Sequence, residues 1–328
     1  MAAATLHPVE SAHDKPRTSE TLTTLEKYGY IVGDIIGRGA FATVKKAYWQ
    51  KMGVTVAVKI VSIAQLGDTL VENGKLREVE AMQKLRHENI IRCYEYFQTN
   101  MRYYITMRYA ENGSLLNLLK KEGHLKEPRA RRYYHELINA LQYIHTHGYA
   151  HRDIKLENLM LDANDRLKLI DFGFACRLWE DASESSSQGE PHLSETFCGS
   201  HAYASPEVLK FKPYDPVPSD IWASGVVLFS LLFGELPFSN KRNVRVMLEI
   251  IAKGVHFPST VRVSEEVKLL LKQIFVPVSQ RITGALIQRS LWFFIELIGD
   301  ESSRRAKVMH GTEMKDHTQT KRQKLNRD

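Results

Sequence analysis

The chain has 328 residues, of which 43% are hydrophobic and 25% are charged, a composition typical of a globular protein with one large or two smaller domains. The first residues show no basic region followed by an apolar stretch, so a secretory signal is not expected; the most apolar run, 226–233, is far shorter than the roughly 20 residues of a membrane span. Three cysteines, Cys93, Cys176 and Cys198, cannot all pair and show no metal-site spacing, which indicates a reducing compartment.

The formal charge of +7 is concentrated near the C-terminus. Between residues 301 and 328, eight Lys and Arg residues stand against four Asp and Glu, a net charge of +4. We predict a basic, disordered tail over 299–328, with nuclear targeting or an acidic partner as the alternatives. The rest of the chain carries little net charge and no nucleic-acid-binding module, so nucleic-acid binding is not expected. Residues 1–27, rich in small polar side chains, are predicted to be a flexible extension.

The first part of the folded region has the alternation and turn signals of an antiparallel sheet. The predicted strands are 28–36, 42–49, 54–61, 90–98 and 102–107. A helix is predicted over 74–86, because Leu76, Val79, Met82 and Leu85 give it one apolar face. Glu78 points toward the same face and needs a partner there, since an unpaired buried charge is costly.

The second part is predicted to be mainly helical, after a connector over 109–113. The predicted helices are 115–121, 128–147, 222–233, 244–253, 265–275 and 284–298. The fold class is therefore α+β, with a small antiparallel sheet lobe that holds one main helix and a larger helical lobe. We place the domain at 28–298, with the small lobe over 28–108 and the connector and large lobe over 109–298.

The residues from His151 to Asn158 precede two short predicted strands, 159–161 and 166–170, and then Asp171-Phe172-Gly173. The twelve residues 159–170 are centred on a turn at 164/165, so a hairpin would place Asn158 opposite Asp171, about 5 Å apart. Two oxygen ligands at that spacing suit a hard cation such as Mg²⁺. Asp153 adds a third polar group in the adjoining loop.

These motifs together resemble the eukaryotic protein kinase family over residues 28–298. Gly37-x-Gly39-x-x-Ala42-x-Val44 resembles the glycine-rich loop, with Ala42 in place of the third glycine. The two glycines would give the backbone the freedom to approach phosphates closely. The resemblance implies the bilobal protein kinase fold, with ATP and Mg²⁺ as cofactors.

The resemblance also implies an ATP site. Val56-Ala57-Val58-Lys59 resembles the strand that carries the phosphate-binding lysine, with Glu78 as its partner and Glu80 as the rival; a surface lysine is the alternative for Lys59. Met107 matches the gatekeeper position and 108–110 the hinge. The implied ATP-binding residues are Gly37, Arg38, Gly39, Ala40, Phe41, Ala42, Val44, Ala57, Lys59, Glu78, Met107, Tyr109, Ala110 and Met160.

By the same resemblance, Asp153 orients the attacking hydroxyl and accepts its proton, and Lys155 steadies the transferred phosphoryl group. Asn158 and Asp171 would hold Mg²⁺. Phosphoryl transfer needs chiefly positioning and charge neutralisation, which this set provides. Lys155, two residues after Asp153, resembles the serine/threonine branch of the family.

Further matches imply structural roles. Ser205-Pro206-Glu207 resembles the family's Ala-Pro-Glu motif, and Asp220-x-Trp222-x-x-Gly225 resembles the helix that supports the catalytic loop. Arg281 is placed to form a buried structural ion pair with Glu207.

Residues 171–207 match the activation segment. Thr196 resembles its phosphorylation site, and we hypothesise that the phosphate pairs with Arg152 and orders the segment. Ser194 is the rival site, and an unmodified Thr196 is the alternative. Ser200 resembles the hydroxyl that contacts Asp153 and Lys155.

The segments 28–30, 171–175 and 196–200 are most similar to the testis-specific serine/threonine kinases of the calmodulin-dependent/AMP-activated group, which implies a role in male germ cells and spermatogenesis. Glu157 occupies a position that often binds an upstream arginine of the substrate. Ser114 and Ser230 stand where relatives often have Glu, so we expect a weaker preference for upstream arginine.

Protein substrates and an upstream activating kinase, or autophosphorylation, are the expected partners. We expect a monomer in the cytoplasm, with the nucleus as a further location, and no membrane. Residues 292–295 and the basic tail are compatible with a calmodulin-binding helix, but we expect them to close the last helix instead. One alternative function is a pseudokinase scaffold, which the presence of Lys59, Asp153 and Asp171 disfavours. A second alternative is a small-molecule phosphotransferase, which the motif at 205–207 disfavours.

Overall fold

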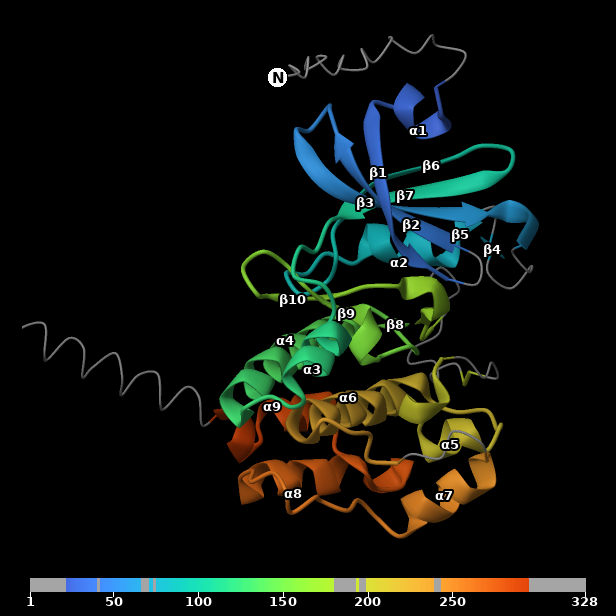
Figure 1. Cartoon of the computed structure of the whole chain (residues 1–328). Helices are drawn as coiled ribbons and strands as arrows, with labels where there is room; N and C mark the ends of the chain where they lie inside the picture. The colour runs from blue at the N-terminus through green and yellow to red at the C-terminus, as the bar shows by residue number, and fades with distance from the viewer. Residues whose placement is uncertain are drawn as a thin grey trace, which may run out of the picture. The chain divides into compact units, whose positions relative to one another are not determined.

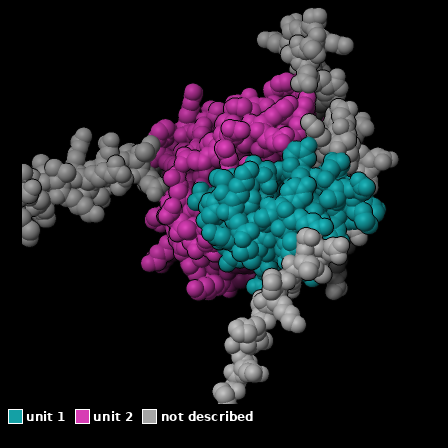
Figure 2. All heavy atoms as spheres, turned by 90° about the horizontal axis from the view of Figure 1, so that it is seen from above, with its two compact units in different colours: residues 1–65, 94–109 teal, residues 66–93, 110–328 magenta. Residues whose placement is uncertain are grey.

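The chain divides into two compact units in the computed structural model. The structure describes residues 22–39, 42–65, 71–72, 75–179, 193–194, 199–238 and 243–294. Unit 1 comprises residues 1–65 and 94–109, and unit 2 comprises 66–93 and 110–328 (Figure 2). The sequence predicted a small lobe over 28–108, whereas 66–93 belongs to unit 2. The reason lies in its contacts: the helix in this segment, α2 (Arg77–Lys84), packs against the turn η4 (Phe172–Phe174) of unit 2.

Unit 1 is built on a five-stranded sheet with the strand order β1-β2-β3-β7-β6 (Figure 1). The strands are β1 (Tyr30–Arg38), β2 (Ala42–Trp49), β3 (Val54–Ser62), β6 (Cys93–Gln98) and β7 (Arg102–Arg108). Strands β1, β2, β3 and β7 pair antiparallel in that order. The predicted antiparallel sheet is present, and β2 has the predicted bounds.

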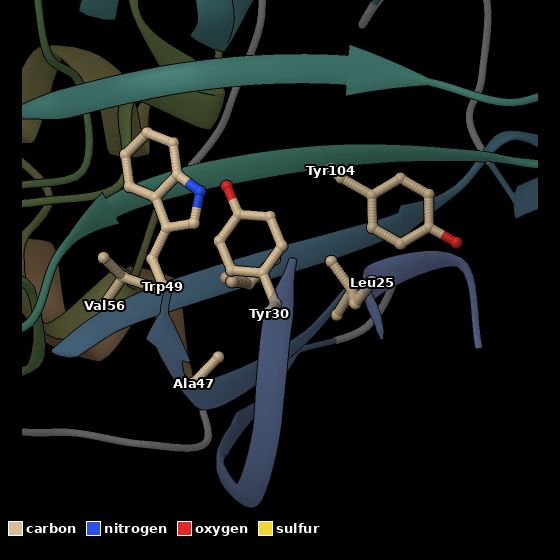
Figure 3. Close-up of a cluster of buried hydrophobic side chains, with 7 residues drawn as sticks. Leu25, Tyr30, Ala47, Trp49, Val56 and Tyr104 are labelled. Carbon is tan, nitrogen blue, oxygen red and sulfur yellow. The ribbon is translucent and has the colours of Figure 1, made fainter. Parts of the chain in front are cut away.

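One face of this sheet packs into a hydrophobic cluster (Figure 3). The cluster consists of Leu25, Tyr30, Ala47, Trp49, Val56, Val58 and Tyr104. Tyr30 is buried there and donates its hydroxyl hydrogen to Glu95 Oε1 at 2.6 Å. Burial, and then the hydrogen bond to the Glu95 carboxylate, raise the pKa of Tyr30 well above its ordinary value.

The short helix α1 (Thr24–Lys27) supplies Leu25 to this cluster. Its start has a reciprocal capping arrangement, in which Glu26 N donates to the Thr23 hydroxyl and Thr23 N donates to Glu26 Oε2. The prediction of a flexible extension through residue 27 is therefore wrong for its last residues. Capping and burial of Leu25 fix them against the sheet.

Unit 2 is mainly helical. Besides α2, its helices are α3 (Leu115–Glu122), α4 (Glu127–Thr146), α5 (Pro206–Leu209), α6 (Pro216–Phe233), α7 (Val244–Ala252), α8 (Glu265–Ile274) and α9 (Gly284–Gln288). Helix α6 packs against α4 and α8 at the centre of this unit (Figure 1). A Cβ on Gly225 of α6 would lie 2.5 Å from Ile274 Cγ2 and 3.1 Å from Phe275 Cε1, so glycine is required for this close helix packing.

Helix α6 is also the one helix among the described residues that is long and apolar enough to cross a membrane. Its side chains are largely buried within unit 2, including Trp222 and Phe229. This is the pattern of a core helix, which is apolar all round because other elements surround it.

Three predicted helices differ from the observed ones by more than one residue at an end. The helix predicted over 222–233 begins earlier, as α6 at Pro216, where the Asp215 side chain caps it. The helix predicted over 74–86 begins at Arg77, because Lys75–Leu76 forms strand β5 and pairs with β4 (Val71–Glu72). Residues that pair in this ladder cannot also form the first turn of the helix. The helix predicted over 284–298 is interrupted: α9 ends at Gln288, and a helical segment follows over 291–294. In that segment Trp292 is buried and donates its indole N–H to Glu127 Oε1 at 2.6 Å.

Candidate active site

The loop that begins at His151 is anchored to α6 through Asp220. The backbone N–H groups of His151 and Arg152 donate to Asp220 Oδ2 at 2.9 Å and Oδ1 at 2.8 Å, and His145 Nε2 lies 2.9 Å from Oδ2. Asp220 is only 1% exposed. Burial alone would raise the pKa of Asp220, but the hydrogen bonds from His145 and the loop hold it below its ordinary value. The predicted support of the loop by this helix is present.

The imidazole of His151 connects this loop to the strand that leads to Asp171. Its Nδ1 accepts a hydrogen bond from the Asp153 N–H at 3.2 Å, and its Nε2 lies 3.0 Å from the carbonyl oxygen of Ile170. Since a carbonyl oxygen can only accept, the ring is the tautomer with its proton on Nε2. The ring also meets Phe172 edge to face, with 4.9 Å between centroids.

Asp153 has one carboxylate oxygen that is held and one that is open. Its Oδ2 accepts from Lys155 Nζ at 2.7 Å and from Asn158 Nδ2 at 2.9 Å. Its Oδ1 is buried and has no hydrogen-bond partner among the described residues. A buried acceptor without a partner is costly, so this oxygen is suited to receive a hydroxyl group from a bound molecule.

Gly199 closes over this carboxylate, a role that the sequence did not indicate. Its φ is +90°, and a Cβ there would lie 2.8 Å from the Arg152 carbonyl oxygen and 3.3 Å from Asp153 Oδ1. Glycine is therefore required at this position. Its place directly before Ser200 was the available signal. Among the described residues, no hydrogen bond joins the Ser200 hydroxyl to Asp153 or Lys155, so the predicted contact is absent there.

The predicted hairpin is present, but its register differs by one residue. Strands β9 (Leu159–Leu161) and β10 (Leu167–Leu169) pair Leu159 with Leu169. The Ile170 N–H donates to the Asn158 carbonyl at 3.0 Å. Asn158 therefore lies opposite Ile170, and the prediction that it lies directly opposite Asp171 is wrong.

The chemistry of the turn explains the shift. Asp162 Oδ1 accepts from the Asn164 and Arg166 N–H groups, each at 3.0 Å, and Asp165 has a φ of +59°. These contacts make a five-residue turn that is not centred on 164/165. Asp171 follows the paired residue Ile170 with a φ of +63°, a left-handed conformation that redirects the chain at this point.

The geometry of Asn158 fits a divalent cation. Its Nδ2 donates to the carbonyl oxygen and to Oδ2 of Asp153, each at 2.9 Å, which leaves its Oδ1 as a ligand atom. No cluster of three or more His, Cys, Asp or Glu side chains suited to a metal occurs within the described ranges. A cation held by one carboxylate, one amide oxygen, phosphate oxygens and water does not require such a cluster.

In unit 1, five of the predicted ATP-binding residues share the sheet face opposite the hydrophobic cluster: Gly37, Val44, Ala57, Lys59 and Met107. Val44 pairs with both Gly37 and Lys59, and Ala57 pairs with Met107. The register of β1 against β2 shifts twice between Val32 and Gly37, which places Gly37 opposite Val44. Arg38 and Ala42 end β1 and begin β2, while Ala40 and Phe41 lie outside the described residues. The ring of Tyr109 lies beneath Lys46 Nζ, 4.9 Å from it.

The two glycines of the loop are not required by the conformation of the chain itself. Neither Gly37 nor Gly39 has a positive φ. A Cβ on Gly37 would lie 3.6 Å from Val44 Cβ, which is an ordinary contact. These glycines are instead explained by a close approach of the backbone to a bound molecule, which a side chain would block.

In unit 2, Glu78 points inward as predicted. It is 7% exposed, and its Oε2 lies 4.0 Å from the position of a Cβ on Gly173. The rival, Glu80, projects elsewhere and forms an ion pair with Arg177. Ala110 is buried. Met160, which lies in strand β9, forms an isolated antiparallel β-bridge with Ser114. The predicted pairing of Glu78 with a lysine of unit 1 stays a prediction.

The family model of the protein kinase domain matches residues 30–293 of the chain. The chain belongs to the protein kinase family. Human testis-specific serine/threonine-protein kinase 4 is 35% identical over 84% of this chain and 86% of its own length. Mouse testis-specific serine/threonine-protein kinase 1 is 39% identical over 82% of this chain and 73% of its own. Rice CBL-interacting protein kinase 11 is 37% identical over 80% of this chain and 51% of its own.

These matches confirm several predictions from the sequence. The chain is a serine/threonine protein kinase, that is, a phosphotransferase, with the mixed α+β fold of the family. The family uses ATP and a divalent metal ion and acts on proteins. The resemblance to the testis-specific kinases of the wider calmodulin-dependent group also holds.

The kinase contains the buried ion pair predicted between Arg281 and Glu207. Arg281 Nη1 lies 2.5 Å from Glu207 Oε1, and Nη2 lies 3.1 Å from Oε2. The guanidinium also donates to the carbonyl oxygens of Ile274 and Pro218 and lies over the Trp222 ring. Burial alone would raise the pKa of Glu207, but Arg281 holds it below its ordinary value.

Arg152 of the kinase reaches the activation segment, although Thr196 lies outside the described residues. Its Nη1 donates to Ser194 Oγ at 2.6 Å, and its Nε donates to the Phe174 carbonyl at 2.6 Å. Ser194 in turn exchanges two backbone hydrogen bonds with Tyr214, at 2.8 and 3.1 Å. The rival phosphorylation site is thus in direct contact with Arg152.

Proposed function

We propose that this kinase transfers the γ-phosphoryl group of Mg-ATP to serine and threonine hydroxyls of proteins, with Asp153 as the group that accepts the hydroxyl proton. One observation carries the proposal. Asp153 presents a buried Oδ1 that has no hydrogen-bond partner among the described residues, while Lys155 and Asn158 fix its other oxygen. This is the arrangement that orients an incoming hydroxyl for in-line attack.

The neighbouring residues have separate tasks in this mechanism. Lys155, at 2.7 Å from Asp153 Oδ2, places a positive charge where the transferred phosphoryl group would carry negative charge. Asn158 and Asp171 would hold Mg²⁺, which neutralises the phosphate charge when bound. Asp220 fixes the backbone from which Asp153 projects. Lys59 and Glu78 are proposed to position the nucleotide phosphates.

A radiolabel assay with Mg-ATP and a peptide library tests this proposal. We expect wild type to phosphorylate Ser and Thr peptides and Asp153→Asn to lose about 10²- to 10⁴-fold in kcat, the range of general-base effects. Removal of the divalent ion with a chelator should abolish turnover. Nucleotide binding by wild type without turnover would instead support the alternative, a pseudokinase scaffold.

We infer a modest preference for arginine upstream of the target residue. The Ser114 hydroxyl caps α3 by accepting from the Asn117 N–H at 3.2 Å, and Ser230 is buried, so neither supplies a negative charge. Glu157 is exposed beside Tyr203 and is the acid that supports arginine binding. A peptide array should show weak arginine selection that Glu157→Gln reduces. Absolute dependence on arginine three residues before the target would contradict this.

We further propose activation by phosphorylation of Thr196, with Arg152 as the receiver of the phosphate. The contact of Arg152 with the activation segment at Ser194 supports this. Thr196→Ala should lower activity and Ser194→Ala should leave phosphorylation at Thr196 intact, as measured by mass spectrometry. Full activity of Thr196→Ala would rule the proposal out. Loss of the modification in Asp153→Asn would assign it to autophosphorylation, and its retention in cells to an upstream kinase.

The relatives named testis-specific support a role in spermatogenesis. We propose a monomer in the cytoplasm, with the nucleus as a further location through the basic segment 299–328, and with no membrane or nucleic-acid partner. Calmodulin binding is not proposed, because Trp292 and Phe293 are buried and would have to leave the core. Expression in germ cells with and without residues 299–328 tests the location.

A further inference from the structure

Arg177 connects the start of the activation segment to helix α2. It lies in the short strand β11 (Cys176–Arg177), whose backbone pairs with β8 (Tyr149–Ala150) just before His151. Its side chain extends to α2 and forms an ion pair with Glu80 Oε1. Lys84 Nζ, one turn further along α2, lies 3.0 Å from the same oxygen. The chain positions 80 and 177 are 97 residues apart.

The ion pair lies at the point where α2 meets the motif Asp171-Phe172-Gly173. Helix α2 packs against η4, which comprises Phe172–Phe174, and Glu78 of α2 approaches Gly173. Glu78 and Glu80 project on different sides of the helix, so Glu80 is not a second candidate for the nucleotide. Its contact instead connects the helix that carries Glu78 to the strand that continues into the activation segment.

The charges in this contact are favourably arranged. The side chains of Arg177 and Glu80 are 31% and 25% exposed, so the pair is partly shielded from water. Burial alone would raise the pKa of Glu80, but Arg177 and Lys84 hold it below its ordinary value, and the carboxylate is therefore ionised at neutral pH. An exposed ion pair contributes little to stability, whereas a shielded one between two elements that can move fixes their relative position.

We propose that Arg177 and Glu80 form a latch by which the activation segment holds α2 in the position that presents Glu78 to the reaction. Arg177 is then a positioning residue, which acts through α2 and does not touch the substrate. The latch rests on the proposed function, because Glu78 matters only if the kinase turns over ATP. A conformational change at the start of the activation segment would reach α2 through this pair.

A double-mutant cycle tests the latch. We expect Arg177→Gln and Glu80→Gln each to lower kcat/KM for ATP by about tenfold, within the range that coupled pairs show, and the double variant to be no worse than either. Arg177→Lys, which keeps the charge, should recover part of the loss. The control is Arg245→Gln, since Arg245 forms an exposed pair with Glu249 at 3.6 Å on α7; it should leave kcat/KM unchanged.

Hydrogen exchange separates the latch from the proposed function. Amides of α2 should exchange faster in Arg177→Gln than in wild type, both in the active protein and in an Asp153→Asn background that does not turn over. Unchanged α2 exchange, or additive losses in the double variant, would overturn the latch. Absence of phosphorylation by wild type would defeat the proposed function, and the exchange experiment would still decide whether the latch exists.

Discussion

Asp220→Asn removes one oxygen acceptor from a fully buried site and should weaken both folding and catalysis. Asp220 accepts from Arg152 N through Oδ1 and from His151 N and His145 Nε2 through Oδ2. The best orientation of the new amide keeps its oxygen at the Oδ2 position. Its NH₂ group then faces the Arg152 N–H, so that one hydrogen bond is lost and two donors meet.

The magnitude follows from that geometry. A buried donor left without an acceptor costs about 1–3 kcal/mol, and bonds to a charged group are worth about 1.5–3 kcal/mol. We therefore expect Asp220→Asn to lower the free energy of unfolding by about 2–4 kcal/mol, measured by urea denaturation. Arg152 has a φ of +66°, and Asp220 fixes its N–H. Loss of that bond should displace the adjoining Asp153 and lower kcat at temperatures where the variant is folded.

Asp215→Asn is a matched control on the same helix. Asp215 caps α6 by accepting from the Val217 N–H at 2.9 Å. Asn is about as good as Asp at this position, so the free energy of unfolding should change by less than about 0.5 kcal/mol. Equal stability and equal kcat for wild type and Asp220→Asn would refute the reasoning that this carboxylate supports the catalytic loop.

Three further variants test other parts of unit 2. Burial lowers the pKa of His135, which stacks on Phe293, to about 4 from 6.5. Between those two pH values only the unfolded chain binds the proton, so the free energy of unfolding should fall by up to about 3 kcal/mol as the pH drops from 6.5 to 4. His135→Phe should flatten this pH dependence when unfolding is measured in urea. Gly225→Ala should destabilise by more than about 2 kcal/mol through the clash with Ile274, seen as a lower melting temperature. Arg281→Met leaves its partner carboxylate buried and unpaired and should cost about 3–5 kcal/mol; a stable, fully active variant would contradict the structural role.

The residues of the chemistry could be predicted from the sequence because they form short, contiguous motifs. His151 to Asn158 and Asp171 to Gly173 were identified by their order and spacing, and strand β2 was predicted with its observed bounds because its alternation is regular. Glu78 was placed on the inner face of its helix by periodicity alone. Patterns of this kind depend on neighbours within a few residues.

The hairpin between Asn158 and Asp171 shows where local symmetry was insufficient. Counting residues from the turn centre predicted the two side chains opposite each other. The side chain of Asp162 and the left-handed Asp165 instead make an asymmetric turn and shift the register by one residue. Residue propensities do not describe side-chain hydrogen bonds such as those of Asp162, and these bonds determine the geometry of the turn.

The tertiary structure alone decided the contacts between distant segments. The pairing of Glu80 with Arg177 had no signal in the order of the residues, and the only signal for the closing of Gly199 over Asp153 was its place directly before Ser200. Arg281 and Glu207, which are 74 residues apart, needed a known family to suggest their pairing. The physical reason is that a charge or a missing Cβ has no preferred partner along the chain, and packing determines which group it meets.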